Sequence, residues 1–487
     1  MLLIGPLLLI CVCRSSIWRK EKSSISLTLR SPAVMLASET RTANANFTKV
    51  REMAKDLLVG SFAAGSSYAE IWIRDSATFI DVALEVNDPS YIRRALLPFF
   101  SVQAENGAMP DAYVNDTAAL EEYPVHAKGD WPICDGHSVV CKNSVETDQE
   151  TSLILAVHSY VRGTNETAFL SETVKGQTVL DRLELSVRYL LSEMRDVNGT
   201  GLLFGATTID WGDIQPEESP GAKISSLSHR AVDVYDNSMF ILALDALADL
   251  CAAVPAADSE SEKSRGSESD RASKWRAMAV RWRSLTREHL WDSSGSRFIP
   301  HLYLSEGSPF PDSFDESRIY FHGGTAVAAL AGVLSSEEVL KSYEQMSRNV
   351  EAVRAAGGAV AIGMTVYPPY PAGLFVNPSV AVEFSYQNAG DWDWFGGRMV
   401  QALVVHKHCK EALEALQMMC DRVVKFDGFF EWFDFDGKPS GSAKFKGSAG
   451  ALGKAVEMMT SSHSRCADMR TATRIHTYAD DTKIETE

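Results

Sequence analysis

The chain has 487 residues, of which 45% are hydrophobic, so it contains enough apolar side chain to bury a large core. Its formal net charge is -17 at pH 7. This acidity argues against a nucleic acid or an anionic membrane surface as the main partner, because both favour a basic face. An uncharged ligand fits the composition better.

The first thirteen residues, MLLIGPLLLICVC, form an apolar run of the length found in signal peptides and too short to span a bilayer. No other stretch is a candidate for a membrane span. The following segment is rich in Ser, Arg and Lys and holds only two acids, which is also typical of an organelle transit segment. We therefore expect residues 1–44 to be a leader that directs the chain into the secretory pathway or out of the cell, or alternatively into a plastid. Four Asn-x-Thr sequons agree with a secretory route, at Asn46, Asn115, Asn165 and Asn198.

Two cysteines, Cys134 and Cys141, enclose a short segment in which a loop-closing disulfide is feasible. The state of the other cysteines outside the leader stays open.

Apolar residues recur along most of the chain at spacings of three and four, which predicts helices, and strand patterns are few. We expect helices over 47–59, 76–86, 90–104, 148–161, 179–195, 233–253, 271–291, 322–333, 336–355, 395–405, 408–425 and 447–460. These helices form one domain over 45–460. Residues 256–274 are polar and charged, which predicts a disordered surface insertion, and 461–487 read as a polar tail.

Loops rich in Trp, Asp, Glu and Gly come before every second predicted helix. They contain the segments EIWIRDS, SVETDQE, TIDWGDIQPEE, IYFHGG, YQNAGDWDWFGG and GFFEWFDFDG. This alternation predicts an all-α fold of two concentric rings, an (α/α)6 toroid of six inner and six outer helices. The inner helices would all point one way, so that the six decorated loops surround a pocket at their N-termini.

Aromatic residues alternate with carboxylates in these loops, which suits the apolar faces and the hydroxyl edge of a sugar ring. A single Trp is more often a core residue, but the repetition over four loops favours a binding site. The aromatic residues concerned are Trp72, Trp211, Tyr386, Trp392, Trp394, Phe430 and Trp432.

Glycoside hydrolysis needs one carboxylic acid to protonate the leaving oxygen and one carboxylate to activate water or attack the sugar. Asp213 in the third decorated loop and Glu431 in the sixth are the best candidates, since these loops face each other across a ring of six. Apolar surroundings could raise one pKa enough to retain a proton. Asp210 competes with Asp213, and Glu383 is a reserve base.

Structural roles stay open for several of these residues. Asp213 could cap backbone N–H groups in its turn. Asp391 and Asp393 could bind hydroxyls or cap the following helix. Arg74 could form a structural ion pair with Asp75.

Five segments resemble successive motifs of six-hairpin glycosidases. They are IWIRDSATF, NGAMPDAY, DWGD followed by AVDVYDNSMFILAL, GDWDWFGGRMV, and FFEWFDFDGKPSGSAKFKGSAGAL. The resemblance covers about residues 45–460. It is strongest to the glucosidase domain of glycogen debranching enzymes and extends to glucoamylases, trehalases and processing α-glucosidases.

This resemblance implies an inverting hydrolysis without a cofactor or a metal, with Asp213 as general acid and Glu431 as general base. It also implies that Arg74 and Asp75 bind the terminal sugar and that Trp72 forms a stacking wall. Two departures, VETDQET around Asp148 and GDWDW in place of a Trp-Pro-Trp core, make glycogen a poor guess for the substrate. The other residues predicted to bind substrate are Asp148, Asp210, Trp211, Tyr386, Gln387, Asp391, Trp392 and Trp394.

The leading hypothesis is therefore an inverting, exo-acting glycoside hydrolase whose partner is an α-linked glucoside or oligosaccharide. Two alternatives stay open. One is a carbohydrate-binding protein that kept the barrel and lost catalysis. The other is a phosphorylase, which would need an anion site near the base.

Overall fold

The computed structural model describes residues 46–254, 268–461, 464 and 466. The expected leader, most of the expected insertion and most of the expected tail lie outside these residues. Within the described ranges, no helix combines the length and the apolar character that crossing a membrane requires.

Helices dominate the described residues, as predicted, and each predicted helix is present within a few residues of its expected ends. A short helix, α4 (Thr117–Glu121), was not predicted. The predicted helices span 46–57, α2 (Ile73–Ala83), α3 (Pro89–Val102), α5 (Asp148–Thr164), α6 (Val179–Glu193), α7 (Val234–Ala253), α8 (Glu268–Leu290), α9 (His322–Leu330), α10 (Ser336–Ala355), α11 (Asp393–Val405), α12 (Cys409–Phe426) and α13 (Lys446–Thr460).

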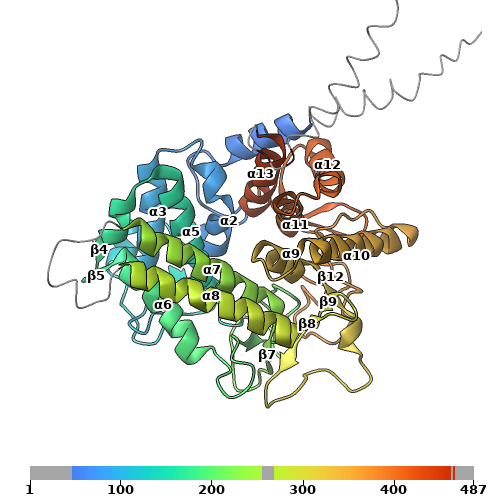
Figure 1. Cartoon of the computed structure of the whole chain (residues 1–487), viewed down its shortest axis with the longest axis horizontal. Coiled ribbons are helices and arrows are strands. Elements are labelled where there is room, and N and C mark those ends of the chain that lie inside the picture. The colour runs from blue at the N-terminus through green and yellow to red at the C-terminus, as the bar shows by residue number, and fades with distance from the viewer. Residues whose placement is uncertain (1–45, 255–267, 462–463, 465, 467–487) are drawn as a thin grey trace, which may run out of the picture. The chain divides into compact units, whose positions relative to one another are not determined.

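Alternate helices pack against one another in a closed cycle. Helix α2 contacts α5, α5 contacts α7, α7 contacts α9, α9 contacts α11, α11 contacts α13, and α13 contacts α2 again. Figure 1 shows these helices around a common centre. The helices between them in sequence pack on members of the cycle, as α8 does on α7 and α12 on α11 and α13.

The two groups of helices differ in how far they are buried. In α9 eight of the nine residues are buried and in α7 15 of the 20 are buried, so these helices are largely enclosed. In α12 the buried residues recur at spacings of three and four, which leaves one face exposed. The pattern of buried residues thus distinguishes helices of the cycle, such as α7 and α9, from a covering helix such as α12.

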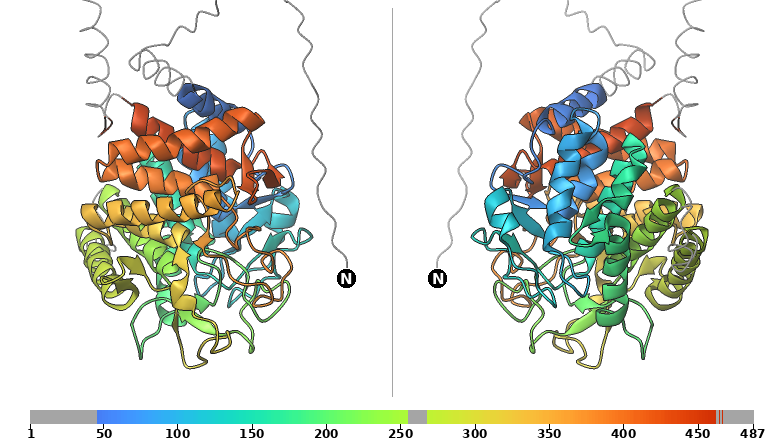
Figure 2. Two further views of the ribbon diagram at one scale, coloured as in Figure 1. Left: turned by 90° about the vertical axis from the view of Figure 1, so that its right-hand side faces the viewer. Right: turned by 90° about the vertical axis from the view of Figure 1, so that its left-hand side faces the viewer.

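Short antiparallel strands lead into several helices of the cycle. Strand β1 runs directly into α2, β11 into α9, and the hairpin of β13 and β14 comes just before α13. Long loops and strands lie together towards the lower right in the left view of Figure 2. The paired strands are β1 (Glu70–Trp72), β2 (Ala112–Val114) and β3 (Val140–Cys141); β6 (Gly205–Ala206), β7 (Arg230–Val232) and β10 (Leu302–Tyr303); β11 (Tyr320–Phe321) and β12 (Val366–Tyr367); β13 (Phe430–Phe433) and β14 (Pro439–Ala443); β4 (Thr173–Val174) and β5 (Gln177–Thr178); and β8 (Trp291–Asp292) and β9 (Arg297–Phe298).

Two disulfides are present among the described residues. The bond between Cys134 and Cys141 closes the loop in which it was considered feasible. The bond between Cys409 and Cys466 was not foreseen, and it ties a buried residue of the expected tail to the start of α12. That part of the tail is therefore fixed to the helical body.

The expected insertion also ends earlier than predicted. Residues 268–274 belong to α8. The predicted insertion and the helix predicted over 271–291 overlapped at 271–274, where the helix is present, and α8 begins three residues before its predicted start. Ala272, Trp275, Ala279 and Trp282 are all buried. Their spacings of three and four place them along one face of the helix, which explains why α8 begins inside a polar segment.

Candidate active site

A cavity of about 290 Å³ opens among the loops before α2, α5, α7, α11 and α13. Four of the six decorated loops contribute lining residues, and the segment before α5 contributes through Asp111, Cys134 and Asn143, which precede SVETDQE. The predicted site residues that line it are Trp72, Arg74, Asp75, Trp211, Asp213, Tyr386, Gln387, Trp392, Trp394 and Glu431.

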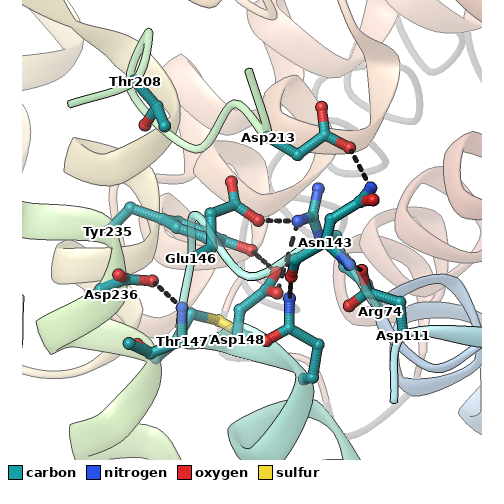
Figure 3. Close-up of polar contacts among 12 residues, drawn as sticks. Arg74, Asp111, Asn143, Glu146, Thr147, Asp148, Thr208, Asp213, Tyr235 and Asp236 are labelled. Carbon is teal, nitrogen blue, oxygen red and sulfur yellow. Dashed lines mark hydrogen bonds and ion pairs between the residues drawn. The ribbon is translucent and has the colours of Figure 1, made fainter. Parts of the chain in front are cut away.

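Asp213 lies on the cavity wall, held by the side chains of two amides. The Nε2 of Gln387 donates to Oδ1 of Asp213 at 2.8 Å. The Nδ2 of Asn143 donates to Oδ2 of Asp213 at 3.4 Å, as Figure 3 shows. The backbone N–H of Asp213 donates in turn to Oε1 of Gln387 at 3.3 Å. The carboxyl group of Asp213 is thus held by two side chains. In these contacts it does not cap backbone N–H groups of its turn, which was the structural role considered from the sequence. Both side-chain partners are uncharged, so they orient the carboxyl group without an ion pair that would fix its charge.

Glu431 projects from β13 and is only 4% exposed. The phenol of Tyr68 donates to its Oε1 at 2.9 Å, and the backbone N–H of Ser442, on the paired strand β14, donates to Oε2 at 2.7 Å. Burial raises the pKa of Glu431 above its ordinary value, while these two hydrogen bonds oppose the rise and the charge of Asp213 adds to it. Glu431 is thus a buried, oriented carboxyl group with two donors.

Arg74 faces the cavity but is already ion-paired behind it. Its guanidinium contacts the carboxylates of Glu146 and Asp148, as Figure 3 shows. The phenol of Tyr235 donates a further hydrogen bond to Asp148 at 2.9 Å. Asp148 was predicted to bind substrate, but it does not line the cavity, and its buried position behind Arg74 makes it a support for that guanidinium.

Two further buried carboxyl groups, Asp75 and Asp111, line the cavity near Arg74. Burial raises the pKa of each to about 7, and the charge of Arg74 partly offsets this for Asp75. Asp111 accepts the backbone N–H of Asn143 at 2.6 Å. The Oδ1 of Asp75 is buried without a hydrogen-bond partner. Because buried polar atoms are normally satisfied, this oxygen is a candidate acceptor for a ligand hydroxyl.

The aromatic residues form one packed wall of the cavity. Trp211 stacks on Phe395 with ring centroids 4.3 Å apart and meets Trp392 edge-on at 4.7 Å. The indole nitrogens of Trp72, Trp211 and Trp394 are buried without a partner. These rings are therefore fixed by one another, and they offer a ligand an apolar face. Phe430 and Trp432 were also expected at the mouth, but they do not line the cavity.

Asp210 was predicted to bind substrate, and the structure gives it another role. Its two carboxylate oxygens accept the backbone N–H groups of Gly323 and Gly324 at 2.7 and 2.8 Å, at the start of α9. A Cβ atom on Gly324 would lie 2.6 Å from the Oδ1 of Asp210, so this close approach requires glycine. Asp210 therefore satisfies helix N–H groups that would otherwise be unpaired, outside the cavity.

Asp391 likewise lies outside the cavity, fully buried. It forms an ion pair with Arg422, and Asp393 contacts the same guanidinium at 2.6 Å. Both carboxylates hold the start of α11 against α12. The structure thus gives Asp391 a structural partner in place of the predicted substrate contact, and the cation comes from an outer helix, which no local pattern reveals.

Five polar residues of the cavity were missed: Tyr68, Asp111, Asn143, Asn377 and Ser379. Asp111 lies within the NGAMPDAY motif, which was noticed for its resemblance without a role for this residue. Tyr68 and Asn143 come just before the decorated segments EIWIRDS and SVETDQE, but only the fold brings them to Glu431 and Asp213.

No family model and no curated protein matches the sequence. The structure is similar to the GH78 family rhamnosidase of Bacillus sp. GL1, with 17% identity, a TM-score of 0.53, and coverage of 86% of this chain and 35% of that chain. It is also similar to the GH63 mannosylglycerate hydrolase of Thermus thermophilus, solved with glucose, with 17% identity, a TM-score of 0.52, and coverage of 84% and 99%. A rhamnosidase from Klebsiella oxytoca with rhamnose bound shares 13% identity at a TM-score of 0.51, with coverage of 84% and 63%.

The chain thus spans about a third of the Bacillus protein and nearly the whole of the Thermus protein. At these identities the likeness concerns the fold. All three proteins are named as glycoside-cleaving enzymes, whereas the resemblance to glycogen debranching enzymes stays a prediction.

Proposed function

We propose that this chain is an inverting, exo-acting glycoside hydrolase built on an (α/α)6 toroid, with Asp213 as general acid and Glu431 as general base. One observation carries the proposal. The two carboxyl groups that the sequence singled out, from loops 218 residues apart (431 minus 213), line the same tryptophan-rich cavity. The names of the structurally similar proteins support the reaction class.

The contacts of the two carboxyl groups suit these roles. Asp213 is oriented by neutral amides, which tolerate a carboxyl group that gives up its proton to the leaving oxygen and later regains one. Glu431 accepts hydrogen bonds from Tyr68 and from the backbone of Ser442, which favour its ionised form and leave it able to take a proton from water. The chemistry needs no cofactor.

The size of the cavity favours a short substrate. Ligand sites in proteins usually span about 300–1,000 Å³, and this cavity lies at the lower end of that range. It is suited to a terminal sugar and a small leaving group. We therefore propose an α-linked glucoside or a short oligosaccharide cleaved from its end.

Two other functions of the same barrel make different demands. A binding protein without catalysis could use the same carboxyl groups to accept sugar hydroxyls, so only a measurement of turnover separates it from a hydrolase. A phosphorylase would need a cation for phosphate beside the base, and the hydrogen-bond partners described for Glu431 are the neutral Tyr68 and Ser442. These neutral partners favour hydrolysis over phosphorolysis.

Disulfide bonds bear on the cellular location. Two are formed among the described residues, and such bonds persist in oxidising compartments. This supports the proposal that the chain passes through the secretory pathway behind its leader, with a plastid as the alternative.

The test is a hydrolysis screen over α-glucosides, α-mannosides and α-rhamnosides, with proton NMR of the anomer released first. Release of the β-anomer from an α-glycoside is expected. In Asp213→Asn and Glu431→Gln we expect turnover to fall by about 10²–10⁴-fold. Glu383→Gln is the matched control, because Glu383 is an exposed carboxylate outside the cavity. Unchanged turnover in either active-site variant would refute the assignment.

A further inference from the structure

One group of lining residues differs from the rest. Its members are apolar or carry neutral polar groups, and Asn143 joins them to Asp213, while the carboxyl group of Asp111 borders them by accepting the backbone N–H of Asn143 at 2.6 Å. We call this group the neutral wall. It consists of Cys134, Asn143, Ile214, Pro220, Ala222, Asn377 and Ser379.

Hydrogen bonds join the parts of the neutral wall to one another. Asn143 accepts the backbone N–H of Cys134 at 3.3 Å, and the neighbouring Ser144 donates its backbone N–H to Ala222 at 2.9 Å. Asn377 donates its amide to the backbone oxygen of Pro220 at 2.8 Å. Segments from three loops therefore form one continuous surface, and Asn143 connects it to Asp213.

The polar atoms of this wall are largely engaged within the protein. Both ends of the Asn377 amide are used, since its oxygen also accepts the backbone N–H of Ser379 at 2.9 Å. The Asn143 amide contacts Asp213 and Cys134. A ligand at the neutral wall therefore contacts mainly apolar surface and the hydroxyl group of Ser379. The amides of Asn143 and Asn377 offer it only the hydrogen bonds that they do not already make within the protein.

The remainder of the lining does not supply a free cation either. Four carboxyl groups line the cavity, those of Asp75, Asp111, Asp213 and Glu431. Arg74 is the one Lys or Arg among the described lining residues, and its guanidinium already contacts Glu146 and Asp148. Burial raises the pKa of Asp75 and Asp111 to about 7, so above that pH the charges lining the cavity are predominantly negative, and an anion placed there would be repelled and poorly solvated.

We infer that the neutral wall receives the leaving group, and that this leaving group is uncharged or positively charged, as a polyol, a second sugar or an amino alcohol is. The inference rests on the proposed function, because Asp213 must reach the oxygen that it protonates. A leaving group bearing a carboxylate or a phosphate would lie beside several carboxyl groups with no free cation to balance it. The site therefore disfavours substrates whose leaving group carries a carboxylate or a phosphate.

The experiment uses four glycosides of one sugar that differ only in the leaving group: glycerol, D-glycerate, the methyl ester of D-glycerate, and 3-amino-1,2-propanediol. D-Glycerate is informative because it is bound in a solved structure of the Thermus hydrolase. At pH 8 and low salt, kcat/KM for the glycerate glycoside should be at least about tenfold below that for its methyl ester, since the ester replaces the negative charge with one methyl group. Equal or faster cleavage of the glycerate glycoside would overturn the inference.

A charge placed on the wall tests its location. Ser379 is exposed, so an arginine there keeps its head group in water. In Ser379→Arg, the ratio of kcat/KM for the glycerate glycoside to that for its methyl ester should rise several-fold. Ser379→Gln separates the effect of size from that of charge and should leave the ratio near its original value. A ratio that does not change in Ser379→Arg would contradict the placement of the leaving group.

Binding calorimetry with the same four glycosides separates this inference from the proposed function. If no glycoside is hydrolysed but the neutral and amine-bearing ones bind more tightly than the glycerate glycoside, hydrolysis fails and the charge preference holds. If the glycerate glycoside binds as tightly as its methyl ester, the charge preference fails. If none of the four binds with any of the three sugars of the screen, both are overturned.

Discussion

The phenol oxygen of Tyr68 lies 2.9 Å from Oε1 of Glu431, although the two residues are 363 positions apart in the chain. Tyr68 comes from the loop before α2, and Glu431 from the hairpin before α13. The packing of α13 against α2 brings these two loops together. The proposed base therefore depends on a donor from the opposite end of the described chain.

Tyr68→Phe should change the pH dependence of the reaction. The hydrogen bond from Tyr68 lowers the pKa of Glu431, so its loss raises that pKa further. Because the base acts when ionised, the acidic limb of the kcat/KM profile should move to higher pH by about one unit. Tyr386→Phe, which also alters a cavity phenol but has no hydrogen bond to Glu431 among those described, should leave this limb in place. A shift to lower pH in Tyr68→Phe would contradict the assigned role.

Gln387→Ala should impair the acid more than Asn143→Ala does. Gln387 holds Asp213 through a 2.8 Å bond to Oδ1 and through the backbone N–H of Asp213, whereas Asn143 makes a single contact at 3.4 Å. We expect kcat to fall by about 10²-fold in Gln387→Ala, as is typical for a misplaced catalytic group, and by less in Asn143→Ala. Steady-state kinetics on one substrate measure both. The reverse order would show that Asn143 is the principal support.

Asp210→Ala should reduce stability and spare catalysis. Asp210 accepts two backbone N–H groups at the start of α9 and does not line the cavity. Loss of such a cap costs about 0.5–2 kcal/mol of the free energy of unfolding, which urea titration measures. The kcat/KM of the folded variant should stay within about threefold of the original, since a stability change of this size leaves the site formed. A loss of turnover as large as that in Asp213→Asn would restore Asp210 as a candidate acid.

Arg422→Met should be severely destabilising. It would leave Asp391 and Asp393, both buried, without the cation that they share, which costs about 3–5 kcal/mol in comparable buried pairs. Arg276→Met is the matched control, because Arg276 and its partner Asp249 are exposed, and such pairs contribute about 0–1 kcal/mol. Urea unfolding of both variants decides the point. Similar losses in the two would contradict the buried-pair assignment.

Asp75→Asn should alter how stability depends on pH. Burial raises the pKa of Asp75 to about 7 in the folded state, above its ordinary value of about 4 in the unfolded chain. Between these values the folded state binds more protons, so the free energy of unfolding falls as pH rises, by at most about 1.4 kcal/mol per unit for this group. The variant should lose less stability than the original protein between pH 5 and pH 8. An equal slope in both would contradict the raised pKa.

Periodicity allowed the helices to be predicted because burial follows spacing. In α12 the buried residues Ala412, Ala415, Leu416, Met419 and Val423 follow the helical repeat. The decorated loops also pointed to Asp213 and Glu431, which line the cavity, but the same loops contain Asp210 and Asp391, which do not. Features that are encoded within one segment could therefore be predicted from the sequence.

Features that depend on partners distant in the chain could not be predicted from the sequence. In the segment IDWGD, two carboxylates stand three positions apart, and the chain turn at Asp210, with a φ of 57°, separates their roles. One meets the N-terminus of α9 and the other meets Gln387. The pairing of Asp391 with Arg422 and of Cys409 with Cys466 likewise joins segments whose association no local spacing encodes.

The closure between α13 and α2 has a consequence for synthesis. The backbone N–H of Lys446 donates to the carbonyl of Ala64 at 2.8 Å, and its ammonium group contacts the carbonyl of Ala63, so the last helix of the cycle is fastened to the loop that carries Tyr68. A nascent chain consequently has no complete cavity until residues beyond 445 have left the ribosome. We therefore expect a chain that ends before residue 445 to lack turnover, because the hairpin of Glu431 would not be held against the loop that carries Tyr68.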